Sequence, residues 1–174
     1  MNVPNILTLS RIVMIPLMVI SFYWFGSMGK VIAAVLFALA AVTDWFDGYL
    51  ARKWNQATPL GAFLDPVADK LIVAVALVLL VEQFASHWLA IPACIIIGRE
   101  IVISALREWM AELGKRANIA VSYIGKVKTT FQMVAIGVLL GSGLHPWLVW
   151  LGYVSLYIAA ILTIWSMLVY LKAA

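Results

Sequence analysis

Residues 44–69 read DWFDGYLARKWNQATPLGAFLDPVAD and contain all four aspartates of the chain, Asp44, Asp47, Asp65 and Asp69. Spacings of three and four residues place the two members of each pair on one face of a helix, because neighbouring turns bring such positions together. The segment is therefore expected to form two helices, each presenting two carboxylates toward one point.

A polar link joins these two expected helices. It runs from Lys53 to Thr58, with Thr58 suited to the N-cap and Pro59 suited to the first helical position. The midpoints of the two aspartate pairs lie at similar distances from the link, roughly 15 Å at about 1.5 Å per residue. An antiparallel hairpin would therefore bring all four carboxylates to a similar depth.

The rest of the chain is strongly apolar. Of its 174 residues, 65% are hydrophobic and 11% are charged, and the mean hydropathy is +1.03. This composition excludes an ordinary water-soluble domain. Six apolar segments of about 20 residues are long enough to span a membrane; they centre near residues 18, 38, 75, 97, 134 and 158. The sequence predicts an all-α, polytopic membrane protein with six transmembrane helices in a single domain, residues 1–174.

Basic residues are unevenly distributed between the two ends of these helices. The turn regions Gly26–Lys30, Glu82–His87 and Gly141–Pro146 hold two formal charges, whereas the opposite end holds eleven of the twelve Lys and Arg residues. The positive-inside rule makes that end cytoplasmic, together with both termini. The net charge of +4 is explained by this topology, and without a polar basic domain no nucleic acid is expected as a partner.

Four carboxylates at membrane depth need compensating charge. Two like charges 4 Å apart repel by about 4 kcal/mol at an effective dielectric constant of 20, so such a cluster must take up protons or bind cations. Oxygen ligands without His or Cys favour Mg²⁺ or Mn²⁺ over zinc. The sequence predicts a two-metal site suited to phosphoryl chemistry, with ligands Asp44, Asp47, Asp65 and Asp69.

Other interpretations of the same aspartates stay open at this point. The carboxylates could form buried salt bridges with Arg52 and Lys70, or line a cation pathway in a transporter. The scarcity of charge at the opposite end of the helices disfavours a transporter. A structural membrane subunit with a vestigial metal site is a third interpretation, and unaltered function after loss of Asp65 would favour it.

The pattern Asp-x2-Asp-Gly-x2-Ala-Arg-x8-Gly-x3-Asp-x3-Asp within residues 44–69 resembles, at every position, the motif of the CDP-alcohol phosphotransferase family. The resemblance implies that family's fold with six helices, a homodimer and divalent metal. It also implies transfer of a phosphatidyl or similar group from a CDP-linked donor to an alcohol, with release of CMP. Gly48, Ala51, Arg52 and Gly61 are then expected to bind the CDP-linked donor, with the small residues leaving room beside the metals.

Four basic residues near the segments centred at residues 97 and 134 indicate which kind of alcohol accepts the transferred group. They are Arg99, Arg107, Lys126 and Lys128. So many cations suit an acceptor that carries a phosphate. Residues 99–115 and 124–130 closely resemble bacterial phosphatidylglycerophosphate synthases, whose acceptor is sn-glycerol 3-phosphate. The resemblance implies transfer of the phosphatidyl group of CDP-diacylglycerol to that acceptor in the bacterial cytoplasmic (inner) membrane, with the active site facing the cytoplasm. Inositol phosphate or serine is the alternative acceptor within the same family.

Roles for individual residues follow as expectations. Asn5, Thr8 and Arg11 also resemble the family and share one stripe of a helix, where they would contact the nucleotide or its phosphates. Asp69 is the candidate base for the acceptor hydroxyl, with Asp65 as a second catalytic residue. Lys70 lies about 100° away from Asp69 around the helix, so another carboxylate or a lipid headgroup is its expected partner. Cys94, the single cysteine, is expected to pack inside the protein.

Overall fold

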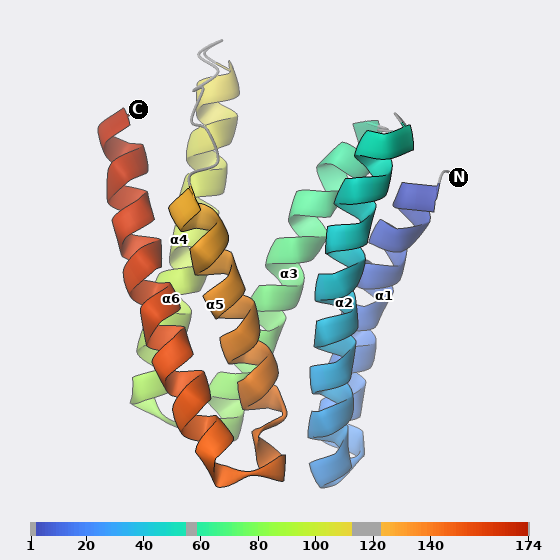
Figure 1. Cartoon of the computed structure of the whole chain (residues 1–174), viewed down its shortest axis with the longest axis vertical. Coiled ribbons are helices and arrows are strands. Elements are labelled where there is room, and N and C mark those ends of the chain that lie inside the picture. Colours follow the sequence, from blue (N-terminus) through green and yellow to red (C-terminus); the bar gives the residue numbers. More distant parts are fainter. Residues whose placement is uncertain (1–2, 55–58, 113–122, 174) are drawn as a thin grey trace.

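The computed structural model describes residues 3–54, 59–112 and 123–173 of the chain, and these residues contain helices and no strand (Figure 1). The all-α prediction is therefore confirmed. The described helices are α1 (Val3–Trp24), α2 (Gly26–Trp54), α3 (Pro59–Phe84), α4 (His87–Glu112), α5 (Tyr123–Leu140) and α6 (Pro146–Ala173), with the short 3-10 helix η1 (Ser142–Leu144) before α6.

Length and hydropathy identify four of these helices as candidate membrane spans. They cover Ile6–Trp24, Gly26–Asp44, His87–Met110 and Pro146–Val169, and α5 adds a shorter apolar stretch, Val127–Leu140. The helix α3 is also largely apolar, but it carries four charged residues, Asp65, Asp69, Lys70 and Glu82, and this number of charges keeps it out of the set of candidate spans. The described residues thus support a polytopic membrane protein, and the number of six spans stays a prediction.

The connection between α1 and α2 is tighter than the sequence suggested. A turn was expected over Gly26–Lys30, but α2 begins at Gly26 itself, so this prediction is wrong in its extent. Gly26 has a φ of +55°, a left-handed conformation that glycine adopts without steric cost. The chain therefore reverses within one residue, and residues 27–30 continue the helix. By contrast, α3 begins at Pro59 as predicted.

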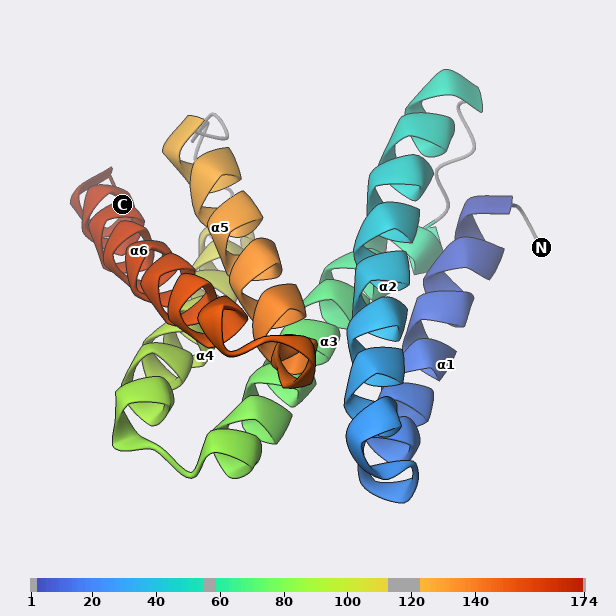
Figure 2. The same ribbon diagram turned by 60° about the horizontal axis from the view of Figure 1, so that its bottom comes forward.

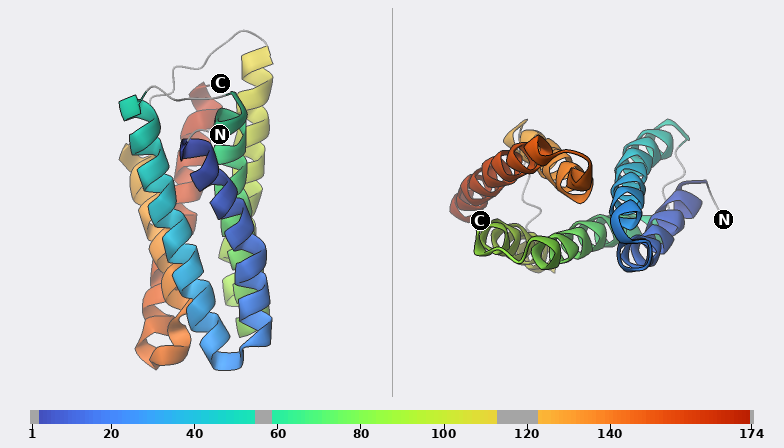
Figure 3. Two further views of the ribbon diagram at one scale, coloured as in Figure 1. Left: turned by 90° about the vertical axis from the view of Figure 1, so that its right-hand side faces the viewer. Right: turned by 90° about the horizontal axis from the view of Figure 1, so that it is seen from below.

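The helices form two groups joined by α3. Helices α1 and α2 lie side by side in one group, and α4, α5 and α6 form the other (Figures 1 and 2). Seen from below, α3 and α4 run along one side of the molecule, between the α1–α2 pair and the α5–α6 pair (Figure 3). The expected hairpin of α2 and α3 exists, but α1 contacts each of them more extensively than they contact each other.

Both termini lie at the same end of the molecule as the C-terminus of α2 and the start of α3 (Figure 1). This agrees with the predicted topology, in which the aspartates and both termini share one side. Which side of a membrane this is stays a prediction from the positive-inside rule.

Most of the buried residues are apolar, and the outer surface is apolar as well. Leu77, Leu80 and Ile136 are fully buried, whereas Trp88 and Trp150 are exposed. A hydrophobic surface of this kind suits a bilayer, where close packing of small residues drives helix association. Cys94 is exposed, so the prediction that it packs inside is wrong; its side chain lies on the outer face of α4.

Candidate active site

Two polar residues of α1 reach the aspartates of α2 and α3. The Nη1 atom of Arg11 lies 2.9 Å from Oδ1 of Asp69 and 3.1 Å from Oδ1 of Asp44. One turn earlier, the hydroxyl of Thr8 donates a hydrogen bond to Oδ1 of Asp65 at 2.5 Å. Because Thr8 and Arg11 are three residues apart, they share one face of α1. This face gathers carboxylates from two other helices around one guanidinium.

The carboxylates of this cluster are more accessible than the cation that holds them. The side chain of Arg11 is 1% exposed, whereas those of Asp44 and Asp69 are 40% and 38% exposed. A buried guanidinium requires charged partners, because an unpaired buried charge is strongly destabilising. Arg11 therefore anchors one oxygen of each carboxylate while both side chains keep a face toward open space.

The donor chemistry of the cluster fits a hard divalent cation. Asp44 and Asp69 already share one positive group, Nη1 of Arg11, and Mg²⁺ and Mn²⁺ prefer oxygen ligands of this kind. Among the described side chains, no group of three or more His, Cys, Asp and Glu residues forms a complete metal site. The side chain of Asp47, the fourth predicted ligand, lies outside the described part. The ligand set of Asp44, Asp47, Asp65 and Asp69 thus stays a prediction.

A second charged cluster is centred on Glu100 of α4. Its Oε1 atom lies 2.7 Å from Nζ of Lys128 and 3.1 Å from Nη1 of Arg99. Arg99 also donates through Nη2 to the hydroxyl of Ser166 on α6, at 3.2 Å. Two of the predicted phosphate-binding cations thus meet at one carboxylate. Sequence reasoning gave Glu100 no role, although an ionisable residue in an apolar membrane segment is itself a functional signal.

A polar cavity joins the two clusters. It has a volume of about 200 Å³, room for roughly six water molecules at about 30 Å³ each or for a small polar molecule. Helices α2, α3, α4 and α5 contribute its polar lining, which consists of Asp44, Asp69, Lys70, Glu100, Lys128, Thr129 and Gln132. Carboxylates and ammonium groups from four helices therefore face one small volume.

Lys70 links α3 to α4. Its ammonium group donates to the hydroxyl of Ser104, and that hydroxyl donates to the backbone carbonyl of Glu100 at 2.5 Å. The sequence predicted a carboxylate or a lipid headgroup as the partner of Lys70, and the hydroxyl of Ser104 was not predicted. Lys70 and Glu100 also line an adjoining, largely apolar pocket of about 350 Å³ between α3 and α4.

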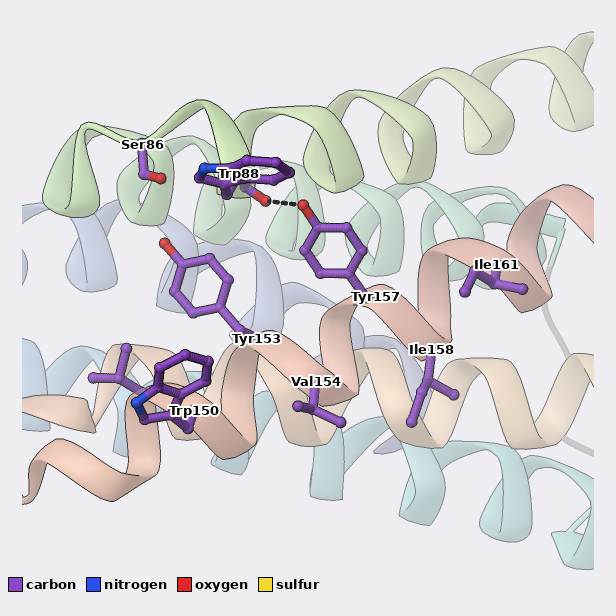
Figure 4. Close-up of a pocket in the computed structure, with 9 residues that line it drawn as sticks. Ser86, Trp88, Trp150, Tyr153, Val154, Tyr157, Ile158 and Ile161 are labelled. Carbon is purple, nitrogen blue, oxygen red and sulfur yellow. Dashed lines mark hydrogen bonds between the residues drawn. The ribbon is translucent and has the colours of Figure 1, made fainter.

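The largest of these cavities lies elsewhere and is apolar. It has a volume of about 720 Å³ between the start of α4 and α6, where the hydroxyl of Tyr157 donates to the backbone carbonyl of Trp88 at 2.8 Å (Figure 4). Tyr153, Trp150 and Ile161 are among its lining residues, and the described residues that line it include no Asp, Glu, Lys, Arg or His. Because chemistry requires convergent polar and titratable groups, the smaller polar cavity is the candidate site.

The remaining predicted site residues are placed as follows. Gly61 is buried on α3, one turn before Asp65. Several others are described by their helical backbone alone; these are Asn5, Asp47, Gly48, Ala51, Arg52, Arg107 and Lys126. The predicted N-cap, Thr58, lies outside the described part of the structure. Thr8 and Arg11 contact carboxylates, and their predicted contacts with a nucleotide stay a prediction.

The chain is similar to known proteins over nearly its whole length. Residues 1–165 match the family model described as CDP-alcohol phosphatidyltransferase. A protein from Escherichia coli (strain K12), named CDP-diacylglycerol--glycerol-3-phosphate 3-phosphatidyltransferase, is 57% identical over 173 residues, which cover 99% of this chain and 94% of the relative. A protein of the same name from Salmonella typhimurium (strain LT2) is 56% identical with the same coverage.

Proposed function

Because this chain belongs to the CDP-alcohol phosphatidyltransferase family, we propose that it transfers the phosphatidyl group of CDP-diacylglycerol to sn-glycerol 3-phosphate. The products are phosphatidylglycerophosphate and CMP, in the synthesis of anionic phospholipid. One observation carries the proposal: a single cavity presents Asp44 and Asp69 on one wall and Lys128 on another. Relatives named for this reaction, similar over nearly the whole chain, support it.

A divalent cation, Mg²⁺ or Mn²⁺ in a two-metal site, forms part of this proposal. Asp44, Asp47, Asp65 and Asp69 would hold it, since carboxylate oxygens are its preferred ligands. When bound, the divalent metal would neutralise the pyrophosphate of the donor and stabilise the charge that develops on the departing CMP.

The residues of α1 position these carboxylates. The guanidinium of Arg11 keeps Asp44 and Asp69 at a fixed separation, and the hydroxyl of Thr8 orients Asp65. Fixing such groups in advance removes the cost of ordering them during the reaction. Asp69 lines the cavity, where it accepts the proton of the attacking acceptor hydroxyl.

The cationic wall binds the phosphate of the acceptor. Lys128 lines the cavity directly, and Arg107 and Lys126 complete the proposed phosphate-binding group. Arg99 contributes through Glu100, which it contacts at 3.1 Å, and it is not among the described residues that line the cavity. Glu100 thereby holds two cations beside the place where the acceptor phosphate binds.

The donor lipid requires an apolar volume next to the polar cavity. The pocket between α3 and α4 meets this requirement, because it shares Lys70, Val73 and Glu100 with the polar cavity and is otherwise lined mainly by aliphatic residues. We propose that a lipid chain of CDP-diacylglycerol lies there.

The proposal also includes a homodimer in the bacterial cytoplasmic (inner) membrane, with the active site and both termini facing the cytoplasm. The family supports the homodimer, and the distribution of basic residues supports the orientation.

Release of CMP tests the proposal directly. Detergent-purified protein receives CDP-diacylglycerol, Mg²⁺ and one acceptor at a time: sn-glycerol 3-phosphate, inositol phosphate or serine. CMP release with glycerol 3-phosphate alone is the expected result. Release with another acceptor would keep the family's chemistry and overturn the assigned acceptor. No release with any of them, together with metal flux through protein-containing vesicles without nucleotide, would favour a transporter instead.

A further inference from the structure

Gln132 is an uncharged polar side chain at the wall of the polar cavity. It lies on α5 one turn after Lys128, is 4% exposed, and lines the polar cavity. Its amide oxygen Oε1 is buried and has no hydrogen-bond partner in the structure. Buried carbonyl oxygens in proteins almost always accept a hydrogen bond. Gln132 therefore offers a buried hydrogen-bond acceptor at the wall of the polar cavity.

The residues around Gln132 indicate which kind of hydrogen-bond donor its amide oxygen would bind. Asp69 and Glu100 attract cations, and Lys128 attracts anions. Thr129, the other uncharged polar residue of the lining, already donates its hydroxyl to the backbone carbonyl of Gly125 at 2.8 Å. An amide oxygen accepts a hydrogen bond from any N–H or O–H donor, and an alcohol hydroxyl is the donor that a phosphate-bearing alcohol would bring into this cavity.

sn-Glycerol 3-phosphate carries a primary and a secondary hydroxyl besides its phosphate. In the proposed reaction one hydroxyl attacks phosphorus and gives its proton to a carboxylate, and the phosphate is bound by cations. The other hydroxyl enters the same small cavity and needs an acceptor, because an unpaired polar group buried in a site weakens binding. Gln132 supplies such an acceptor.

We propose that Gln132 determines acceptor specificity by accepting a hydrogen bond from the secondary hydroxyl of sn-glycerol 3-phosphate. This inference rests on the proposed function. A site built to bond a substrate hydroxyl discriminates strongly against an analogue that lacks it, because its own buried polar group is then unpaired. The residue is a specificity determinant and takes no part in moving the phosphatidyl group.

The test uses an acceptor analogue that lacks only the secondary hydroxyl, 3-hydroxypropyl phosphate. The Gln132→Met variant keeps the length of the side chain and removes the amide oxygen. The matched control is Gln83→Met, because Oε1 of Gln83 is also buried without a hydrogen-bond partner. Gln83 lies on α3 about 20 Å from Asp69 along the helix axis, far from the cavity. The measurements are KM for glycerol 3-phosphate and Ki of the analogue as its competitor.

With Gln132→Met, we expect KM for glycerol 3-phosphate to rise roughly tenfold, the effect of losing one buried hydrogen bond, while Ki of the analogue changes less than about threefold. The ratio of Ki to KM therefore collapses in this variant and stays unchanged in Gln83→Met. An equal change of both constants, or no change in either, would overturn the inference.

A second variant guards against a general loss of folding. Gln132→Glu keeps an oxygen that accepts a hydrogen bond, and its added charge repels the phosphate of both acceptors alike. The ratio of Ki to KM should therefore stay near its wild-type value even if both constants rise, and a collapse of the ratio would count against the inference. Failure of the proposed function looks different, since the wild-type protein would then release no CMP with glycerol 3-phosphate.

Discussion

Nη1 of Arg11 on α1 lies 2.9 Å from Oδ1 of Asp69 on α3, a contact between residues 58 positions apart in the chain. The same atom lies 3.1 Å from Asp44 on α2, so one buried guanidinium connects three helices. The carboxylates of the motif are thus held by a residue outside the motif.

Replacement of Arg11 by Lys should reduce CMP release at least tenfold while the protein still folds. An ammonium keeps the charge, but it lacks the planar fork that holds two carboxylates in fixed positions. CMP release and the melting temperature of the purified variant check this. Lys30→Arg is the control, because Lys30 lies over the ring of Phe22 at 5.9 Å from its centroid, on the far end of the molecule. Wild-type activity in Arg11→Lys would contradict the positioning role.

Replacement of Thr8 by Val removes the hydroxyl that bonds to Asp65 and keeps the shape of the side chain. We expect the Mg²⁺ concentration for half-maximal CMP release to rise several-fold, since a supporting residue orients a metal ligand. Thr163→Val is the matched control, because Thr163 is fully buried and its hydroxyl oxygen has no hydrogen-bond partner. If the Mg²⁺ concentration for half-maximal CMP release rose equally in both variants, the assignment of Thr8 would be contradicted.

Replacement of Asp69 by Asn should abolish turnover and leave much of the donor binding. The amide keeps the size of the side chain but cannot take a proton from the acceptor hydroxyl. Turnover is measured as CMP release, and donor binding by titration of CDP-diacylglycerol in detergent. If Asp69→Asn retained more than about a tenth of wild-type turnover, another group would have to be the base, because general bases typically contribute 10²–10⁴-fold.

Replacement of Glu100 by Gln should raise KM for glycerol 3-phosphate more than KM for CDP-diacylglycerol. The carboxylate pairs with Lys128 and Arg99, and a neutral amide would hold these cations less firmly beside the acceptor. Loss of one partner of a buried pair also costs up to about 3–5 kcal/mol, so the melting temperature should fall. Glu82→Gln is the control, because Glu82 accepts a hydrogen bond from the hydroxyl of Tyr23 at the other end of α3. Equal effects on both KM values would argue against an acceptor-side role.

Removal of divalent metal should stop CMP release completely. Oxygen ligands favour Mg²⁺ and Mn²⁺, so either ion should restore activity after treatment with EDTA, whereas Zn²⁺ should not. A protein that released CMP at the same rate in EDTA would contradict the predicted role of the aspartates. Binding of Mn²⁺ measured by electron paramagnetic resonance, and its loss in a variant with Asp44 and Asp65 replaced by Asn, provides a readout independent of turnover.

Much of this molecule follows from local sequence patterns. The apolar segments predict membrane helices because each segment is long enough to cross a bilayer, and spacings of three and four place Asp44 with Asp47 and Asp65 with Asp69 on helix faces. Pro59 begins α3 as expected. The predicted turn at Gly26–Lys30 was too long, because α2 begins at Gly26. The sharp turn depends on the left-handed φ of +55° at Gly26, and a glycine in the sequence permits this conformation but does not require it.

The sequence alone therefore determined the helices, the aspartate motif and the family, because these depend on residue order and helical periodicity. The partners of each charge were decided only by the tertiary structure. Arg11 meets Asp44 and Asp69, Glu100 meets Lys128, and Gln132 enters the cavity, because separate helices pack at particular depths and rotations. Periodicity shows which residues share a face of one helix, and packing between helices sets what that face contacts.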